Sequence, residues 1–157
     1  MQPNIEIPDN DRAAIVDILN QLLSDEYVLY TKTRNYHWNV TGPQFNDLHT
    51  FFEAQYEALN DVVDEVAERA RQLGGRALGS LAEFTKAARL TEQPDTTPNA
   101  TQMIRALLMD HETLIRSLRA DIGPVAERLH DVGTSDFLTG LLEKHEKMAW
   151  MLRAYVS

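Results

Sequence analysis

The 157-residue sequence contains no cysteine. It therefore has no disulfide framework, no cysteine-ligated zinc finger and no thiol nucleophile. It also lacks an apolar run approaching the roughly 18 residues that cross a bilayer. The first twelve residues have neither the basic segment nor the apolar segment of a secretory signal. These absences predict a cytoplasmic protein that does not enter a membrane.

Positive charge is scarce as well. Lys and Arg total 15 against 24 Asp and Glu, which makes the formal net charge −9. Because phosphate binding needs clustered Lys and Arg, this balance disfavours nucleic acid as a partner and suits the handling of cations. The 43% hydrophobic and 25% charged residues are ordinary values for a globular chain. The length predicts one domain over residues 1–157, in which residues 1–10 form a short flexible tail.

Glycine and proline are few, with seven and six residues, and they separate long segments of helical periodicity. The expected first helix begins at residues 9–11 and ends at the Thr41-Gly42-Pro43 breaker. The second covers residues 46–73 and stops at Gly74-Gly75. A connection over residues 74–98 follows, with a short helical segment over residues 80–88.

The C-terminal half predicts two more long helices. The third begins near Asn99, and Gly123-Pro124 is expected to kink or break it before it continues to His130. Thr134 or Ser135 is expected to cap a fourth helix that ends with the chain. The sequence therefore predicts an all-α fold, a ferritin-like four-helix bundle whose long crossover between the second and third long helices carries a short helix. Other four-helix topologies share this pattern.

Ligands suited to a metal ion gather on the second helix. His49 and Glu53 are four residues apart and share a face, as do Asp64 and Glu68. The two pairs are offset by only about 60° around the helix. His37 lies near the turn that precedes this helix. Imidazoles with carboxylates suit iron, zinc or manganese.

One helix cannot bring both pairs to one ion, because Asp64 lies about 22 Å along the axis from His49. Either the pairs have unrelated roles, or a second copy of the helix runs antiparallel across a two-fold axis and completes an intersubunit site. A ferritin-type site within one bundle needs two Glu-x-x-His motifs, and Glu127 to His130 is the single one present. Simpler alternatives remain: solvated acid pairs, a Glu68 that pairs with Arg69 or Arg71, and packed histidines.

Two segments resemble the signatures of the Dps family, the DNA-binding proteins from starved cells or mini-ferritins. The first is the stretch Asn35-Tyr36-His37-Trp38-Asn39-Val40-Thr41-Gly42-Pro43 with Phe45, Asp47-Leu48-His49 and Phe52-Glu53. The second is Asp64-Glu65-Val66-Ala67-Glu68-Arg69 with Gly74-Gly75. Leu81-Ala82-Glu83-Phe84 is similar to the family's short crossover helix. The resemblance covers about residues 13–155.

This resemblance implies a hollow shell of twelve identical subunits that oxidises Fe(II), preferably with hydrogen peroxide, and stores the ferric product as a mineral. It implies a di-iron ferroxidase centre at each two-fold interface, protective against oxidative stress. His37, His49 and Glu53 would come from one subunit, and Asp64 and Glu68 from its mate. The family often has Asp where this chain has Glu53, so the longer side chain shifts that carboxylate. Zinc or manganese are the substitutes that the ligand set allows.

Further roles also follow from the resemblance. Trp38 is similar to the family's tryptophan near the iron site, with interface packing as the alternative. Asp131 and Asp136 fall where the family lines its three-fold pores, with ordinary loop and cap carboxylates as the alternative. The family's name-giving activity, nucleoid DNA binding and compaction, is the competing function. It commonly uses lysine-rich tails, which both termini lack, so weak or absent DNA binding is expected. His111, His130 and His145 match no motif and are expected to be structural or solvent-facing.

Overall fold

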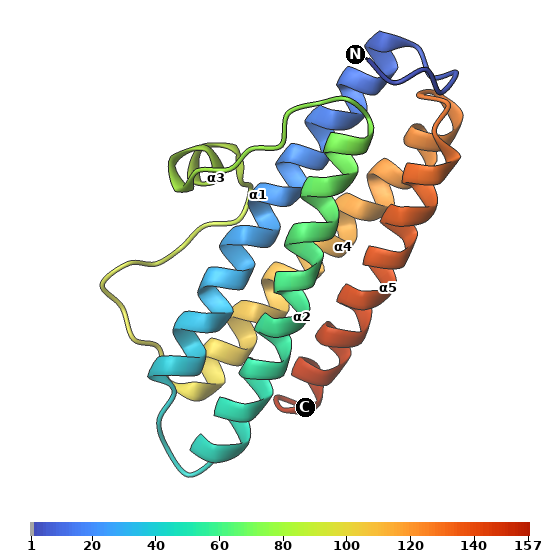
Figure 1. The fold of residues 1–157 in the computed structure, drawn as a ribbon. Coiled ribbons are helices and arrows are strands. Elements are labelled where there is room, and N and C mark those ends of the chain that lie inside the picture. Colours follow the sequence, from blue (N-terminus) through green and yellow to red (C-terminus); the bar gives the residue numbers. More distant parts are fainter. Residues whose placement is uncertain (1) are drawn as a thin grey trace.

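The computed structural model of the protein describes residues 2–157 and consists of helices joined by loops, with no strand in this range. Four long helices form the bundle (Figure 1), and a short one lies outside it. In chain order they are α1 (Asp9–Asn39), α2 (Phe45–Gln72), α3 (Leu81–Ala87), α4 (Ala100–Glu127) and α5 (Val132–Ala154). The expected all-α bundle with a helix in its crossover is confirmed.

The bundle consists of two helical hairpins. α1 packs along α2, α4 packs along α5, and the hairpins meet mainly where α1 contacts α4, whereas α2 and α5 touch sparsely. Each long helix supplies fully buried side chains at helical spacing. Burying each of these side chains stabilises the fold by about 1.5–3 kcal/mol. The largest of them are Phe52, Ile15, Leu19, Leu23, Leu29, Leu48, Leu59, Met103, Leu107, Leu114, Leu118 and Leu138.

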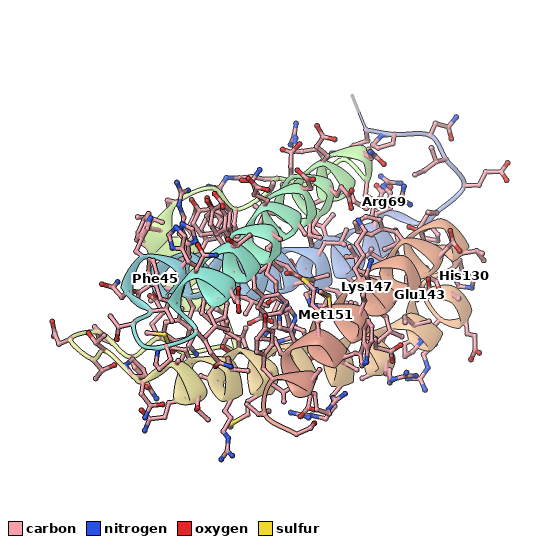
Figure 2. All side chains as sticks on the ribbon, turned by 90° about the horizontal axis from the view of Figure 1, so that it is seen from below. Phe45, Arg69, His130, Glu143, Lys147 and Met151 are labelled. Atoms are coloured by element: carbon pink, nitrogen blue, oxygen red, sulfur yellow. The ribbon has the colours of Figure 1, made fainter. Side chains whose placement is uncertain are left out.

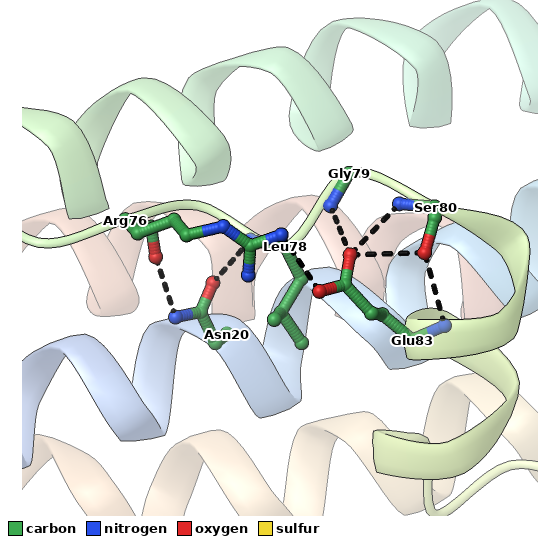
Figure 3. Close-up of polar contacts among 6 residues, drawn as sticks. All are labelled: Asn20, Arg76, Leu78, Gly79, Ser80 and Glu83. Atoms are coloured by element: carbon green, nitrogen blue, oxygen red, sulfur yellow. Dashed lines mark hydrogen bonds and ion pairs between the residues drawn. The ribbon is translucent and has the colours of Figure 1, made fainter.

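The crossover runs along the outside of α1 from the end of α2 to the start of α4 (Figure 1). Asn20 on α1 donates to the carbonyl oxygen of Arg76 and accepts from the amide of Leu78, both at 2.9 Å (Figure 3). Ser80 and Glu83 form a reciprocal capping box at the start of α3. The hydrogen bond from Arg76, with those from Gly79 and Ser80, lowers the pKa of Glu83 to about 2.

Asp25 holds the second half of the crossover. Its carboxylate is fully buried on α1. It accepts hydrogen bonds from the backbone amides of Arg89 and Leu90, at 2.5 and 3.1 Å, and from the Arg89 guanidinium at 2.7 Å. These bonds give partners to backbone amides of an extended segment that has no helical hydrogen bonds of its own, and they hold the segment against the bundle.

Two boundary predictions were wrong. Of the predicted kink or break at Gly123-Pro124, the break does not occur, because α4 continues through both residues to Glu127. Proline removes one intrahelical donor, but it lies in the last turn, where Val125 is fully buried and Arg128 donates to the Pro124 carbonyl. The fourth long helix is capped by Asp131, whose side chain accepts from the amide of Thr134, so Gly133 lies within the helix.

Two further ends differ by three residues, because α4 stops at Glu127 before the predicted His130 and α5 stops at Ala154 before the end of the chain. The other boundaries agree with the sequence within about two residues. α1 begins at Asp9, so the segment before it is shorter than predicted. Within that segment, the ring of Pro3 lies so close to Gly74 that a β-carbon there would approach it to 2.6 Å. Across residues 2–157, no helix combines the length and the hydropathy that crossing a bilayer requires.

Candidate metal centre

His37 and His49 meet where α1 ends and α2 begins. Their rings stack with centroids 3.8 Å apart and an angle of 18° between the planes. Nδ1 of His37 lies 2.7 Å from the carbonyl oxygen of His49, and Nδ1 of His49 lies 2.8 Å from the carbonyl oxygen of His37. Because a carbonyl oxygen only accepts, each Nδ1 carries a proton, so in the neutral form of each ring the lone pair lies on Nε2.

This reciprocal arrangement is the one that metal-binding histidines use. A histidine ligand donates its other ring N–H to a carbonyl or carboxylate, which sets its tautomer and its orientation. His37 is buried, so its ring is held in place by packing as well. The structure therefore presents two adjacent imidazoles whose Nε2 atoms are chemically ready to bind a metal ion.

Aromatic rings enclose the pair. The ring of Phe45 lies 5.2 Å from that of His49, and the ring of Tyr56 meets that of His37 edge-on, also at 5.2 Å. Partial burial and then the negative charge of Glu53 raise the pKa of Tyr56. Glu53 is itself half-buried, one helical turn beyond His49.

Trp38 lies beside the pair but projects outward. Its side chain is 64% exposed, and the guanidinium of Arg34 lies 5.3 Å from its ring centroid. Such exposure is unusual for a tryptophan, and it is compatible with both roles that the sequence predicts, an interface contact and a position near iron.

The structure does not bring Asp64 and Glu68 to the histidines. His49, Asp64 and Glu68 belong to the continuous helix α2, so about 22 Å of helix axis separates His49 from Asp64. Figure 2 shows Phe45 at one end of the bundle and Arg69 toward the other. Over residues 2–157, no three His, Asp or Glu side chains converge in a way that could hold a metal ion. Both carboxylates are exposed.

The alternative role for Glu68, pairing with a neighbouring arginine, is not the arrangement observed. Arg69 donates to Thr134, Gln72 and Asp131. Arg71 donates to the carbonyl oxygen of Gly75. Both arginines that the sequence offers to Glu68 are therefore directed elsewhere.

Comparison with known proteins decides the family. The profile of the ferritin-like domain matches residues 16–157. A low temperature-induced protein of Nostoc sp. is 46% identical over 98% of this chain and 86% of its own. DNA protection during starvation protein 2 of Bacillus anthracis is 35% identical over 91% of this chain and 97% of its own. The chain belongs to the Dps family of ferritin-like proteins. The crystal structure of the Dps protein from Vibrio cholerae, described as a member of a broad superfamily of ferritin-like diiron-carboxylate proteins, is similar with a TM-score of 0.92 and 31% identity, over 99% of this chain and 97% of that one.

The two aspartates that the Dps resemblance assigns to a pore differ in this subunit. Asp131 is buried, caps α5 and lies 3.3 Å from the Arg69 guanidinium. Its carboxylate thus has a structural role within the subunit, as the alternative reading expects. Asp136 is exposed on the first turns of α5. The pore assignment of both residues stays a prediction.

Three further features of this Dps subunit were not assigned to the metal centre from the sequence. Tyr56 packs on His37, a contact that depends on how α1 and α2 align. His111 and His145 are fully buried and hydrogen-bonded to each other, so they are structural as expected. His130 is exposed and lies 3.0 Å from Asp11, outside any helix, which removes the lone Glu-x-x-His motif from consideration.

Proposed function

We propose that this Dps-family protein oxidises Fe(II) at centres shared between two subunits and stores Fe(III) inside a hollow shell of twelve subunits. The observation that carries the proposal is the pair formed by His37 and His49, whose Nε2 atoms retain their lone pairs because both Nδ1 atoms donate to carbonyl oxygens. Such a pair is half of a ligand set, and carboxylates from elsewhere must complete it.

A second subunit can supply the missing half. Two copies of α2 that run antiparallel across a two-fold axis place Asp64 and Glu68 of one opposite His49 and Glu53 of the other. The exposure of both acidic residues fits a surface that another subunit covers. One interface then contains two equivalent centres, each with His37, His49 and Glu53 from one side.

The ligand types suit the chemistry. Carboxylates are hard anionic ligands that favour Fe(III) over Fe(II), so they assist oxidation. Hydrogen peroxide accepts two electrons when its O–O bond breaks, one from each of two Fe(II) ions, and two protons complete two waters. This pairing avoids hydroxyl radical and fits a protective role. Because imidazoles bind metal only when neutral, metal affinity is expected to fall as the pH drops through the histidine range.

The comparisons support this reading at the level of the family. The Vibrio cholerae structure is titled a member of the ferritin-like diiron-carboxylate superfamily, and the Bacillus anthracis relative is named for DNA protection during starvation. We extend iron binding and stress protection to this chain on that basis, and we place the activity in the cytoplasm. The same ligands would accept Zn²⁺ or Mn²⁺ as substitutes.

Mixed shells test the shared centre. One variant carries His37→Ala with His49→Ala, and the other carries Asp64→Ala with Glu68→Ala. Each variant alone should lose peroxide-driven Fe(II) oxidation and tight Zn²⁺ binding. Co-assembled in equal amounts, they should regain about a quarter of both, because half of the interfaces pair unlike subunits and each of those keeps one intact centre.

The control for these shells is a second exposed acid pair on α2, changed as Asp61→Ala with Glu65→Ala, which should keep full activity. Particle mass verifies that every variant assembles as the unaltered protein does. If the mixed shells assemble but stay inactive, the centre is not shared between subunits. If the histidine variant alone oxidises Fe(II) at the unaltered rate, the ligand assignment itself is wrong.

A further inference from the structure

A chain of three titratable side chains crosses the core of the bundle, remote in sequence from the candidate metal ligands. It consists of Glu26 on α1, His145 on α5 and His111 on α4. All three are fully buried, with 0% exposure. Buried titratable groups are rare because removing charge from water is costly, so their protonation has to be accounted for.

His145 is the centre of the chain. Its Nε2 lies 2.7 Å from Oε1 of Glu26, and its Nδ1 lies 2.9 Å from Nδ1 of His111. The first contact joins the two hairpins, since Glu26 belongs to the α1–α2 pair and His145 to the α4–α5 pair. The second joins α4 to α5.

Each of these two contacts requires one hydrogen. If Glu26 is ionised and both imidazoles are neutral, each contact still has its one hydrogen. A net negative charge then remains in the core, beside a Glu26 Oε2 that has no hydrogen-bond partner. With one more proton, His145 donates to His111 and shares the other hydrogen with Glu26, and the three groups together are electrically neutral. The second state avoids an uncompensated buried charge, which is the expensive outcome.

Other charges nearby have partners of their own. On α1, Asp25 is bound by Arg89 and Lys32 by Asp110 of α4. From α2 the buried polar side chain on this side is Gln55, which is uncharged and donates to the carbonyl of Met148 on α5. No other charged side chain in residues 2–157 is hydrogen-bonded or ion-paired to Glu26, His111 or His145. The three groups therefore balance charge among themselves.

We propose that Glu26, His145 and His111 hold one shared proton as a buried carboxylate–imidazolium pair with a neutral His111 acceptor, and that a second proton opens the bundle. The reason for opening is geometric. A protonated His111 would point an N–H at the N–H of His145 across 2.9 Å, and neither nitrogen could then accept. The contact cannot persist with two cationic rings.

The electrostatics of His111 agree with this geometry. Burial, and then the positive charge of His145, hold the pKa of His111 well below its ordinary value. In the unfolded chain His111 has an ordinary pKa of about 6.5. Below that pH the unfolded chain binds a proton that the folded chain refuses, so stability is lost as the pH falls. Each subunit's folding equilibrium should drop about tenfold per pH unit through this single site.

Solid-state NMR of the assembled protein with ¹⁵N-labelled histidine tests the shared proton. At about pH 8 ordinary histidines are neutral. We expect one of the five imidazoles to be cationic at that pH, with both nitrogens protonated and a through-space contact to a neutral ring. The signal should disappear in Glu26→Gln. Five neutral rings in the unaltered protein would overturn the proposal, and this measurement needs no variant to fold.

His111→Asn tests the acid response. The amide oxygen replaces Nδ1 as acceptor but does not titrate, so acid unfolding followed by circular dichroism should shift to lower pH while stability at pH 8 changes little. His111→Gln serves if the asparagine variant fails to assemble. His130→Gln removes an exposed imidazole and is the control, with no such shift expected. An acid transition in both His111 variants that matches the unaltered protein would overturn the proposal.

Discussion

The Asp25 carboxylate on α1 should be the polar group on which the position of the crossover depends most. In Asp25→Ala, the amides of Arg89 and Leu90 lose their acceptor, and the Arg89 guanidinium loses its partner. A buried donor left unsatisfied costs about 1–3 kcal/mol, and a bond to a charged group contributes about 1.5–3 kcal/mol. Because Leu90 is 7% exposed, water replaces these bonds only after the segment detaches.

We therefore expect Asp25→Ala to lower the free energy of unfolding by about 3–5 kcal/mol. Urea unfolding at fixed protein concentration gives this value, and hydrogen exchange should show the amide of Leu90 exchanging faster than the bundle core. Asp17→Ala, an exposed aspartate on the same helix, is the control and should change stability by less than about 0.5 kcal/mol. Equal, small effects in the two variants would refute the assignment.

Two further predictions concern close packing and the termini. Gly75→Ala should destabilise the protein by about 1–3 kcal/mol in urea unfolding, because a β-carbon there would lie 2.4 Å from a methyl of Val16. Gly79→Ala is the control and should be tolerated, because a β-carbon there meets nothing within 4 Å. Equal stability of these two variants would contradict the packing seen at Gly75. The protein should not retard duplex DNA in a gel at physiological salt, because Arg12, the first basic residue of the chain, is buried and donates to Asp9. Tight, salt-sensitive retardation would contradict this.

The helices follow from the sequence because their cause is local. Apolar residues at helical spacing, capping residues and glycine stops are visible within one turn of where they act. The short helix was predictable for the same reason, since Ser80 and Glu83 form its capping box within four residues. The family followed from two local signatures as well, around His37 and around Asp64.

The predictions that failed are those in which packing outweighs a local signal. Pro124 usually ends a helix, yet the buried Val125 holds the last turn in place. Thr134 and Ser135 are suitable caps by their sequence, yet Asp131 caps α5. Its carboxylate is held there by Arg69, which lies 62 positions earlier.

For the candidate site, three features can be read from the sequence: the residue types, their shared face on α2 and the distance that prevents one helix from gathering them. The tautomer of His37 and of His49 depends on helix packing, because each ring hydrogen-bonds to a carbonyl of the other helix. Only the tertiary structure brought Glu26, His111 and His145 together, since 119 positions separate the first from the last. Helical periodicity is a local property of the chain, whereas hydrogen bonds between helices depend on the register in which the helices pack.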